Sequence, residues 1–96
     1  MNLEKVSALY DIAEYMHDEE LTQALEIVAK IIVNPQIPPH AVSYEIVRLQ
    51  AYATKFAMVA SYMANVDKTD RPKKNMYYSA ASAIGDLVAA LKYLLK

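Results

Sequence analysis

One pair of residues in the sequence stands at a metal-binding spacing, Glu14 and His17. Side chains three apart lie on one face of a helix, and Glu-x-x-His pairs hold metals in carboxylate-bridged helical bundles. Such sites need a second pair and two further glutamates, yet His40, the other histidine, has no glutamate three positions before it. The pair therefore predicts a solvated helix end, and we expect no metal site.

The sequence also lacks the residue patterns that other kinds of catalysis need. The chain has no cysteine, which excludes thiolate catalysis, disulfides and cysteine-ligated zinc. A phosphate-binding loop needs several glycines, and this sequence has one. No serine is paired in an evident way with His17 or His40 beside a glycine-bearing turn that would form an oxyanion hole. We expect a non-enzymatic protein without a cofactor or a small-molecule substrate.

The remaining chemical signal is basic and aromatic. Cations can neutralise phosphates, and each base stacked on an aromatic ring contributes about 1–3 kcal/mol to single-strand binding. Candidate nucleic-acid-binding residues lie on one helix edge and in a following loop, and they are Arg48, Lys55, Lys68, Arg71, Lys73, Lys74, Tyr77 and Tyr78. The competing interpretation is a solvated turn whose tyrosines close the core with their hydroxyls at its rim.

The elements that would carry these residues are all helical. A single glycine, helix-forming residues throughout and apolar residues at helical spacing predict an all-α fold. We expect a single domain over residues 1–96, a four-helix bundle-like fold with a long C-terminal helical hairpin. The expected helices run approximately over 3–16, 18–33, 40–66 and 76–95, with the proline-rich connector 34–39 before the third and Asn75 capping the fourth.

Three features predict an assembly rather than a free monomer. Hydrophobic residues make up 55% of the chain, more than the core of a domain this small can bury. Acidic residues outnumber basic ones by six through Val47, and basic residues outnumber acidic ones by five from Arg48 onward. Small residues at spacing four, Ala81, Gly85 and Ala89, form a ridge at which we expect a close oligomer contact.

A polar but uncharged stripe follows the third helix. Solvated helix faces usually carry charges, so this stripe is either an ordinary exposed face or a polar helix interface. Its members are Ser43, Gln50, Thr54, Ser61 and Asn65.

The sequence contains no uncharged apolar run of about 18 residues and does not begin like a signal peptide. We therefore expect a soluble, cytoplasmic protein that does not bind a membrane.

The segment 45–51, Glu-Ile-Val-Arg-Leu-Gln-Ala, with Lys55 and Tyr62 after it, resembles a helix of the UvsY-type recombination mediators of tailed phages. The resemblance covers about a quarter of the chain. It implies a small phage-encoded helical protein that forms ring oligomers and binds single-stranded DNA, with Arg48 and Lys55 facing the DNA.

The leading hypothesis is a self-associating, non-enzymatic adaptor or assembly protein, with a homo-oligomer or another protein as partner. The alternative is a recombination accessory protein that binds single-stranded nucleic acid through its basic C-terminal half.

Overall fold

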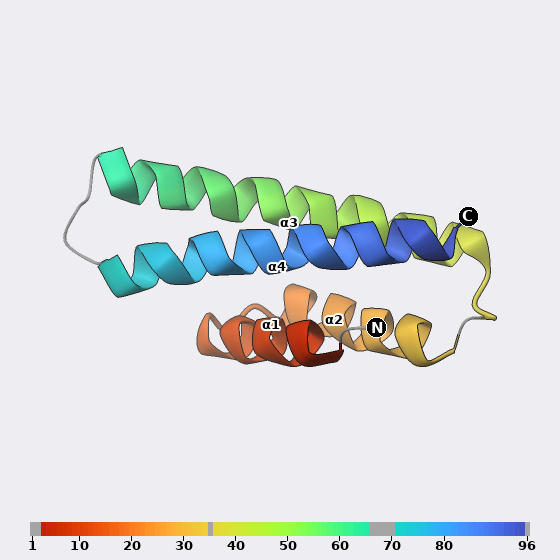
Figure 1. Cartoon of the computed structure of the whole chain (residues 1–96). Coiled ribbons are helices and arrows are strands. Elements are labelled where there is room, and N and C mark those ends of the chain that lie inside the picture. Colours follow the sequence, from red (N-terminus) through yellow and green to blue (C-terminus); the bar gives the residue numbers. More distant parts are fainter. Residues whose placement is uncertain (1–2, 35, 66–70, 96) are drawn as a thin grey trace.

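The computed structural model describes residues 3–34, 36–65 and 71–95, and these form four α-helices (Figure 1). Helix α1 is Leu3–Tyr15, α2 is Glu19–Val33, α3 is Pro39–Asn65 and α4 is Arg71–Leu94. The predicted all-α fold is therefore confirmed. The first three helices begin within a residue of their expected positions, whereas α4 begins five residues earlier than expected.

Local chemistry accounts for the turn between α1 and α2. His17 adopts a left-handed conformation with φ of 55°. Its backbone N–H donates to the carbonyl of Glu14 at 3.1 Å, and the N–H of Asp18 donates to the carbonyl of Ala13 at 2.9 Å. These two bonds form a Schellman motif, which satisfies carbonyls that the end of α1 leaves free. The chain reverses here without a glycine.

Proline positions explain where two other helices begin or end. Helix α2 stops at Val33, before Pro35 in the sequence, and the intervening Asn34 has the extended φ of −130° that a residue before proline favours. Pro39 is the first residue of α3, where its missing N–H removes no helical bond. Pro72 is likewise accommodated in the first turn of α4, so the segment expected as a loop through Lys74 is helical.

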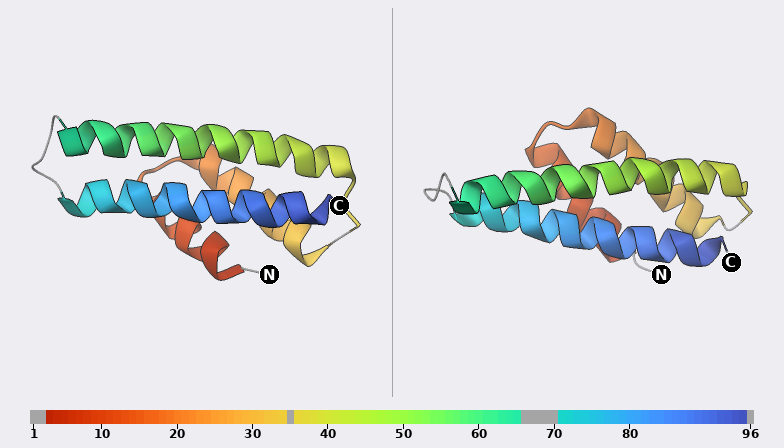
Figure 2. Two further views of the ribbon diagram at one scale, coloured as in Figure 1. Left: turned by 45° about the horizontal axis from the view of Figure 1, so that its top comes forward. Right: turned by 90° about the horizontal axis from the view of Figure 1, so that it is seen from above.

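The helices form two layers (Figure 2). Helices α3 and α4 make a long antiparallel hairpin, and the shorter α1–α2 hairpin crosses one of its faces, with α1 against α4 and α2 against α3. The molecule is elongated, with extents of 46 × 22 × 20 Å. The core lies between the layers and is built from the faces predicted by helical spacing, with Leu9, Leu21, Leu25, Leu49, Ile84, Leu87 and Leu91 fully buried.

This arrangement leaves one side of α3 uncovered. The residues that α3 turns inward, among them Ile46, Leu49 and Phe56, contact the other helices. The opposite side faces away from α1, α2 and α4 (Figure 1). The α3–α4 hairpin also extends beyond the end of the α1–α2 layer, on the side where α3 ends and α4 begins.

Candidate interaction surfaces

The uncovered side of α3, which we call the α3 outer face, carries large apolar side chains. Tyr44, Val47, Met58 and Tyr62 are 65%, 66%, 68% and 60% exposed. With the exposed Ala51 they recur at steps of three, four and seven residues, which places them on one stripe of the helix. A monomer that left this stripe in water would expose large apolar side chains along its longest helix, on both sides of Thr54 and Lys55.

The polar residues of the α3 outer face are almost all uncharged. Ser43, Gln50, Thr54, Ser61 and Asn65 are all exposed and flank the apolar stripe. Among the exposed residues of α3, every one of which is described, Lys55 is the single lysine, arginine, aspartate or glutamate. A helix side that contacts only water is usually rich in charged residues. The uncharged composition of this side therefore favours a surface that contacts another helix.

Arg48, which the sequence suggested as a DNA contact, makes several contacts within the protein. Its guanidinium donates to the backbone carbonyl of Glu20 at 3.2 Å and to Oε1 of Glu45 at 3.5 Å. It also lies 6.0 Å from the ring of Tyr44, and its side chain is 18% exposed. Arg48 therefore connects α3 to the start of α2, and a phosphate would have to compete with these partners.

Glu45 is the buried charged residue that sequence reasoning missed. It is 2% exposed, and its Oε2 atom has no hydrogen-bond partner among the described residues. Burial raises the pKa of this carboxyl, while the nearby Arg48 guanidinium opposes that shift. The spacing of Glu45 and Arg48, three residues apart on a helix, was the available signal for the pair.

Asp18 connects three helices. Its Oδ1 accepts from the backbone N–H of Leu21 at 3.0 Å, which caps α2, and from the hydroxyl of Tyr52 on α3 at 3.1 Å. Its own N–H closes α1. Burial, followed by the negative charge of Asp18, raises the pKa of the Tyr52 phenol above its usual value. These contacts are structural, and they also show that the acid-rich turn is held in place.

The remaining candidate cations lie at the start of α4. Arg71, Lys73 and Lys74 occupy its first turn and the residue after it, which contain no acidic residue. Tyr78 is 44% exposed one turn further on, whereas the Tyr77 ring packs 5.6 Å from that of Phe56. Tyr78 is therefore the more exposed residue of the pair. Lys68 lies outside the described residues.

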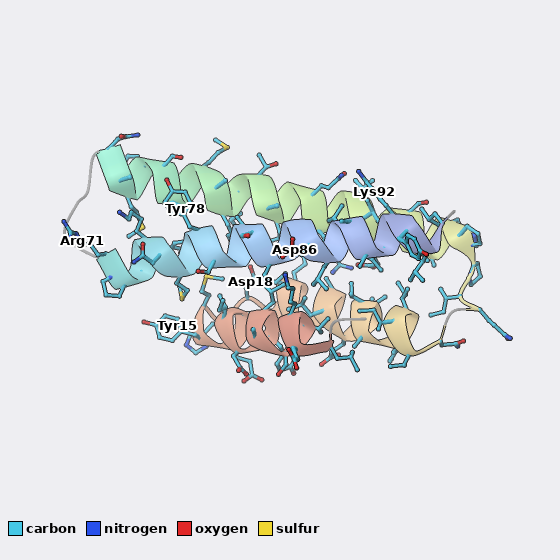
Figure 3. All side chains as sticks on the ribbon, viewed as in Figure 1. Tyr15, Asp18, Arg71, Tyr78, Asp86 and Lys92 are labelled. Carbon is cyan, nitrogen blue, oxygen red and sulfur yellow. The ribbon has the colours of Figure 1, made fainter. Side chains whose placement is uncertain are left out.

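The two groups of candidate cations do not meet. Arg48 stands seventeen residues before the end of α3, which corresponds to about 25 Å along the helix. Arg71 lies at the end of the α3–α4 hairpin where α3 ends, and therefore far from Arg48 (Figure 3). Lys55 is exposed, with its ammonium 5.7 Å from the ring of Tyr52. One molecule thus presents a short basic end rather than a continuous basic track.

The small-residue ridge lies on α4 with unequal exposure. Ala81 is half-buried against the core, while Gly85 and Ala89 are exposed. No heavy atom among the described residues outside its own helix turn lies within 4 Å of where a Gly85 Cβ would stand. The close helix crossing expected at Gly85 is therefore not made by any described residue of the chain, and a contact between copies at this ridge stays a prediction.

Within the described ranges, no group of three or more histidine, aspartate or glutamate side chains is arranged to hold a metal ion. Glu14 and His17 line an open groove between α1 and α2 together with Asp18 and Glu26. None of the helices, over the residues described, combines the length and apolarity needed to cross a membrane.

Comparisons with protein families, with curated proteins and with solved structures returned no match to this chain. The resemblance to UvsY-type mediators therefore stays a prediction, and the interpretation of function depends on the surfaces described above.

Proposed function

We propose that this protein is a non-enzymatic helical assembly protein that associates with itself through the α3 outer face. The observation that carries the proposal is the exposed stripe of Tyr44, Val47, Met58 and Tyr62 on a helix side that bears one lysine as its only charged residue. Large exposed apolar side chains gathered on one face are typical of interaction sites on soluble proteins.

The size of the stripe supports a specific contact. From Tyr44 to Tyr62 it spans eighteen residues, or about 27 Å of helix. Its tyrosines and methionine belong to the residue types enriched at interface cores, whereas lysine, glutamate and aspartate are depleted there. The uncharged Ser, Thr, Gln and Asn side chains beside the stripe supply hydrogen-bonding groups that can be buried at lower cost than charges.

Sedimentation velocity of the purified chain tests the proposal over a range of concentrations from about 10 μM to 1 mM, where interfaces of modest area associate. We expect the sedimentation coefficient to rise with concentration. Met58→Glu places a charge in the centre of the stripe and should shift the association to at least about tenfold higher concentration, because burying an unpaired carboxylate is costly.

Tyr93→Glu is the matched control, because Tyr93 is 71% exposed on α4 and lies outside the stripe. It should leave the association unchanged. A wild-type chain that sediments as a monomer throughout the range contradicts the proposal, and so does equal weakening by the two substitutions.

Single-stranded nucleic-acid binding is the second candidate, and the basic end of the hairpin favours it. Arg71 and Lys74 lie beside the positive N-terminal end of the α4 dipole, which adds to their attraction for phosphate. The exposed ring of Tyr78 offers a surface on which a base can stack. Because the patch is short, we propose weak binding by one chain that several copies would strengthen.

Fluorescence anisotropy with an unstructured labelled oligonucleotide at low salt tests this candidate. The double variant Arg71→Ala/Lys74→Ala should weaken binding and reduce its dependence on salt, because fewer counterions are released. Lys30→Ala/Lys92→Ala removes the same charge from α2 and from the far end of α4 and should act less (Figure 3). Equal weakening by both double variants would indicate non-specific attraction and contradict this candidate.

A further inference from the structure

The α3 outer face has a nearly symmetric order of residues about its midpoint. Tyr44 matches Tyr62, Val47 matches Met58, Ala51 matches Thr54 and Ser43 matches Ser61, and each pair is centred within half a residue of position 52.5. The large apolar side chains therefore lie toward both ends of the face, and Ala51 and Thr54 lie near the middle together with Gln50 and Lys55.

Helix geometry preserves this symmetry around the circumference as well as along the axis. Tyr44 and Tyr62 are eighteen residues apart, which is five full turns, and so are Ser43 and Ser61. Val47 and Met58 are eleven apart, close to three turns. The pairs Tyr44/Tyr62, Ser43/Ser61 and Val47/Met58 thus each lie on one flank of the helix, with the tyrosines on one flank and the serines on the other.

A two-fold axis perpendicular to a helix relates positions in this manner. When two identical helices pair antiparallel, a residue before the midpoint on one flank meets the residue at the same distance after the midpoint on the same flank of the second copy. Two-fold interfaces are self-complementary, which requires a surface to match itself under that operation. The α3 outer face meets this requirement toward its two ends, where Tyr44 is placed opposite Tyr62 and Val47 opposite Met58.

We infer that the partner of the α3 outer face is a second copy of this chain, bound antiparallel about a two-fold axis near residues 52 and 53. This inference rests on the proposed self-association and specifies its geometry. In the dimer Tyr44 packs against Tyr62 of the second copy and Val47 against its Met58. The exposed Ala51 and Thr54 allow the two α3 helices to approach closely.

The single lysine of the face is consistent with this geometry. Lys55 stands two to three residues from the midpoint, so the antiparallel pair offsets the two Lys55 residues by about 7–8 Å along the axis. A parallel, in-register pair would place the two lysines at the same height along the helix axes. The antiparallel pair also places the N-terminal end of each helix dipole beside the C-terminal end of the other.

The contact made by one helix per chain is small compared with stable dimers, which bury about 800 Å² on each partner. We therefore expect a dissociation constant in the range of about 10–100 μM, as for a transient interface.

Disulfide trapping tests the register, because the chain contains no cysteine of its own. Val47→Cys and Met58→Cys are made separately, mixed at equal high-micromolar concentration and oxidised, and the products are separated by mass. A disulfide requires Cα atoms within about 7 Å. In the inferred dimer position 47 faces position 58 of the second copy, whereas two copies of position 47 are about 16 Å apart along the axis.

We expect the mixed 47–58 dimer to exceed each homodimer by at least about tenfold, because only the mixed pair meets the distance limit of a disulfide. Tyr15→Cys, 72% exposed on α1, measures the background of random collisions. Homodimers that form as readily as the mixed dimer would overturn the antiparallel register.

Sedimentation of the unmodified chain separates the failure of this inference from that of the proposed function. If the chain dimerises and no trapping exceeds the Tyr15→Cys background, the inferred antiparallel register is wrong while self-association stands. If the chain stays monomeric at the concentrations used for trapping, both are overturned.

Discussion

Replacing Glu45 with methionine should stabilise the protein at neutral pH. The carboxyl is 2% exposed and its Oε2 has no hydrogen-bond partner within the described part of the chain, which costs about 1–3 kcal/mol in lost solvation. Methionine has a similar length and an apolar end that can occupy the same space. The substitution therefore removes a buried, partly unsatisfied charge from between the helices.

The stabilising contact that the substitution removes is worth less than this solvation cost. The Glu45 contact with Arg48 is 3.5 Å long, at the outer limit of a hydrogen bond, and we assign it about 1 kcal/mol or less. Arg48 keeps the backbone carbonyl of Glu20 at 3.2 Å and its position beside the Tyr44 ring. The net expectation is a free energy of unfolding about 1 kcal/mol higher than that of the wild type.

The effect should depend on pH in a defined direction. Burial raises the pKa of Glu45, so the folded state holds this proton more tightly than the unfolded state does. The stability that this group contributes is present below the pKa of the unfolded carboxyl, near 4.5, and is lost as pH rises through the raised pKa. Methionine does not titrate, so the advantage of the variant should be smaller near pH 4 than near pH 7.

Urea unfolding followed by far-ultraviolet circular dichroism measures both quantities, at a protein concentration low enough that self-association does not contribute. Glu14→Met, on an exposed position of α1, is the control and should change stability by no more than about 0.5 kcal/mol. The reasoning is refuted if Glu45→Met destabilises the protein by more than about 1 kcal/mol near pH 7, or if its advantage does not change with pH.

Three further substitutions test other contacts by the same unfolding measurement. His17→Gly should raise the free energy of unfolding by about 1 kcal/mol, because glycine adopts a φ of 55° without the strain that a Cβ causes; no gain would contradict the assigned turn. Gly85→Ala should also raise the free energy of unfolding by about 1 kcal/mol, since the position is helical and open. A lower stability of the monomeric variant would mean that the Gly85 position is not open. Tyr52→Phe removes the hydroxyl that donates to Asp18 and should cost about 1 kcal/mol, and an unchanged stability would mean that water replaces this bond.

Helical spacing predicted the buried face of each helix because burial follows the 3.6-residue period. On α3 the apolar residues at steps of three and four are Val42, Ile46, Leu49, Ala53, Phe56, Ala60 and Met63, and all are buried except the half-buried Ala53. The start of α4 was misplaced because a basic segment with a proline has the composition of a loop. Pro72 fits a first helical turn equally well, so composition could not distinguish the two.

The polar contacts could not be predicted in the same way, because they depend on which helices become neighbours. In the sequence Arg48 resembles any surface cation. Its contact with the backbone carbonyl of Glu20 depends on where α2 packs, which the sequence pattern did not predict. Glu45 lies next to Ile46 on the edge of the buried stripe, and the approach of α2 decides whether that edge is open or covered. The α3 outer face, by contrast, was visible in part as the uncharged stripe, since its residues depend on no intramolecular partner.

The overhang of the α3–α4 hairpin beyond the α1–α2 layer gives the molecule a gradient of local stability (Figure 1). Ala60 and Met63 are buried near that end but lie outside the main core cluster. Backbone amides over approximately 58–65 and 71–79 should therefore exchange with deuterium through local opening well before those around Leu49 and Leu87, which need global unfolding. The end that carries Arg71 and Tyr78 is thus the part of the fold that can rearrange without disturbing the core.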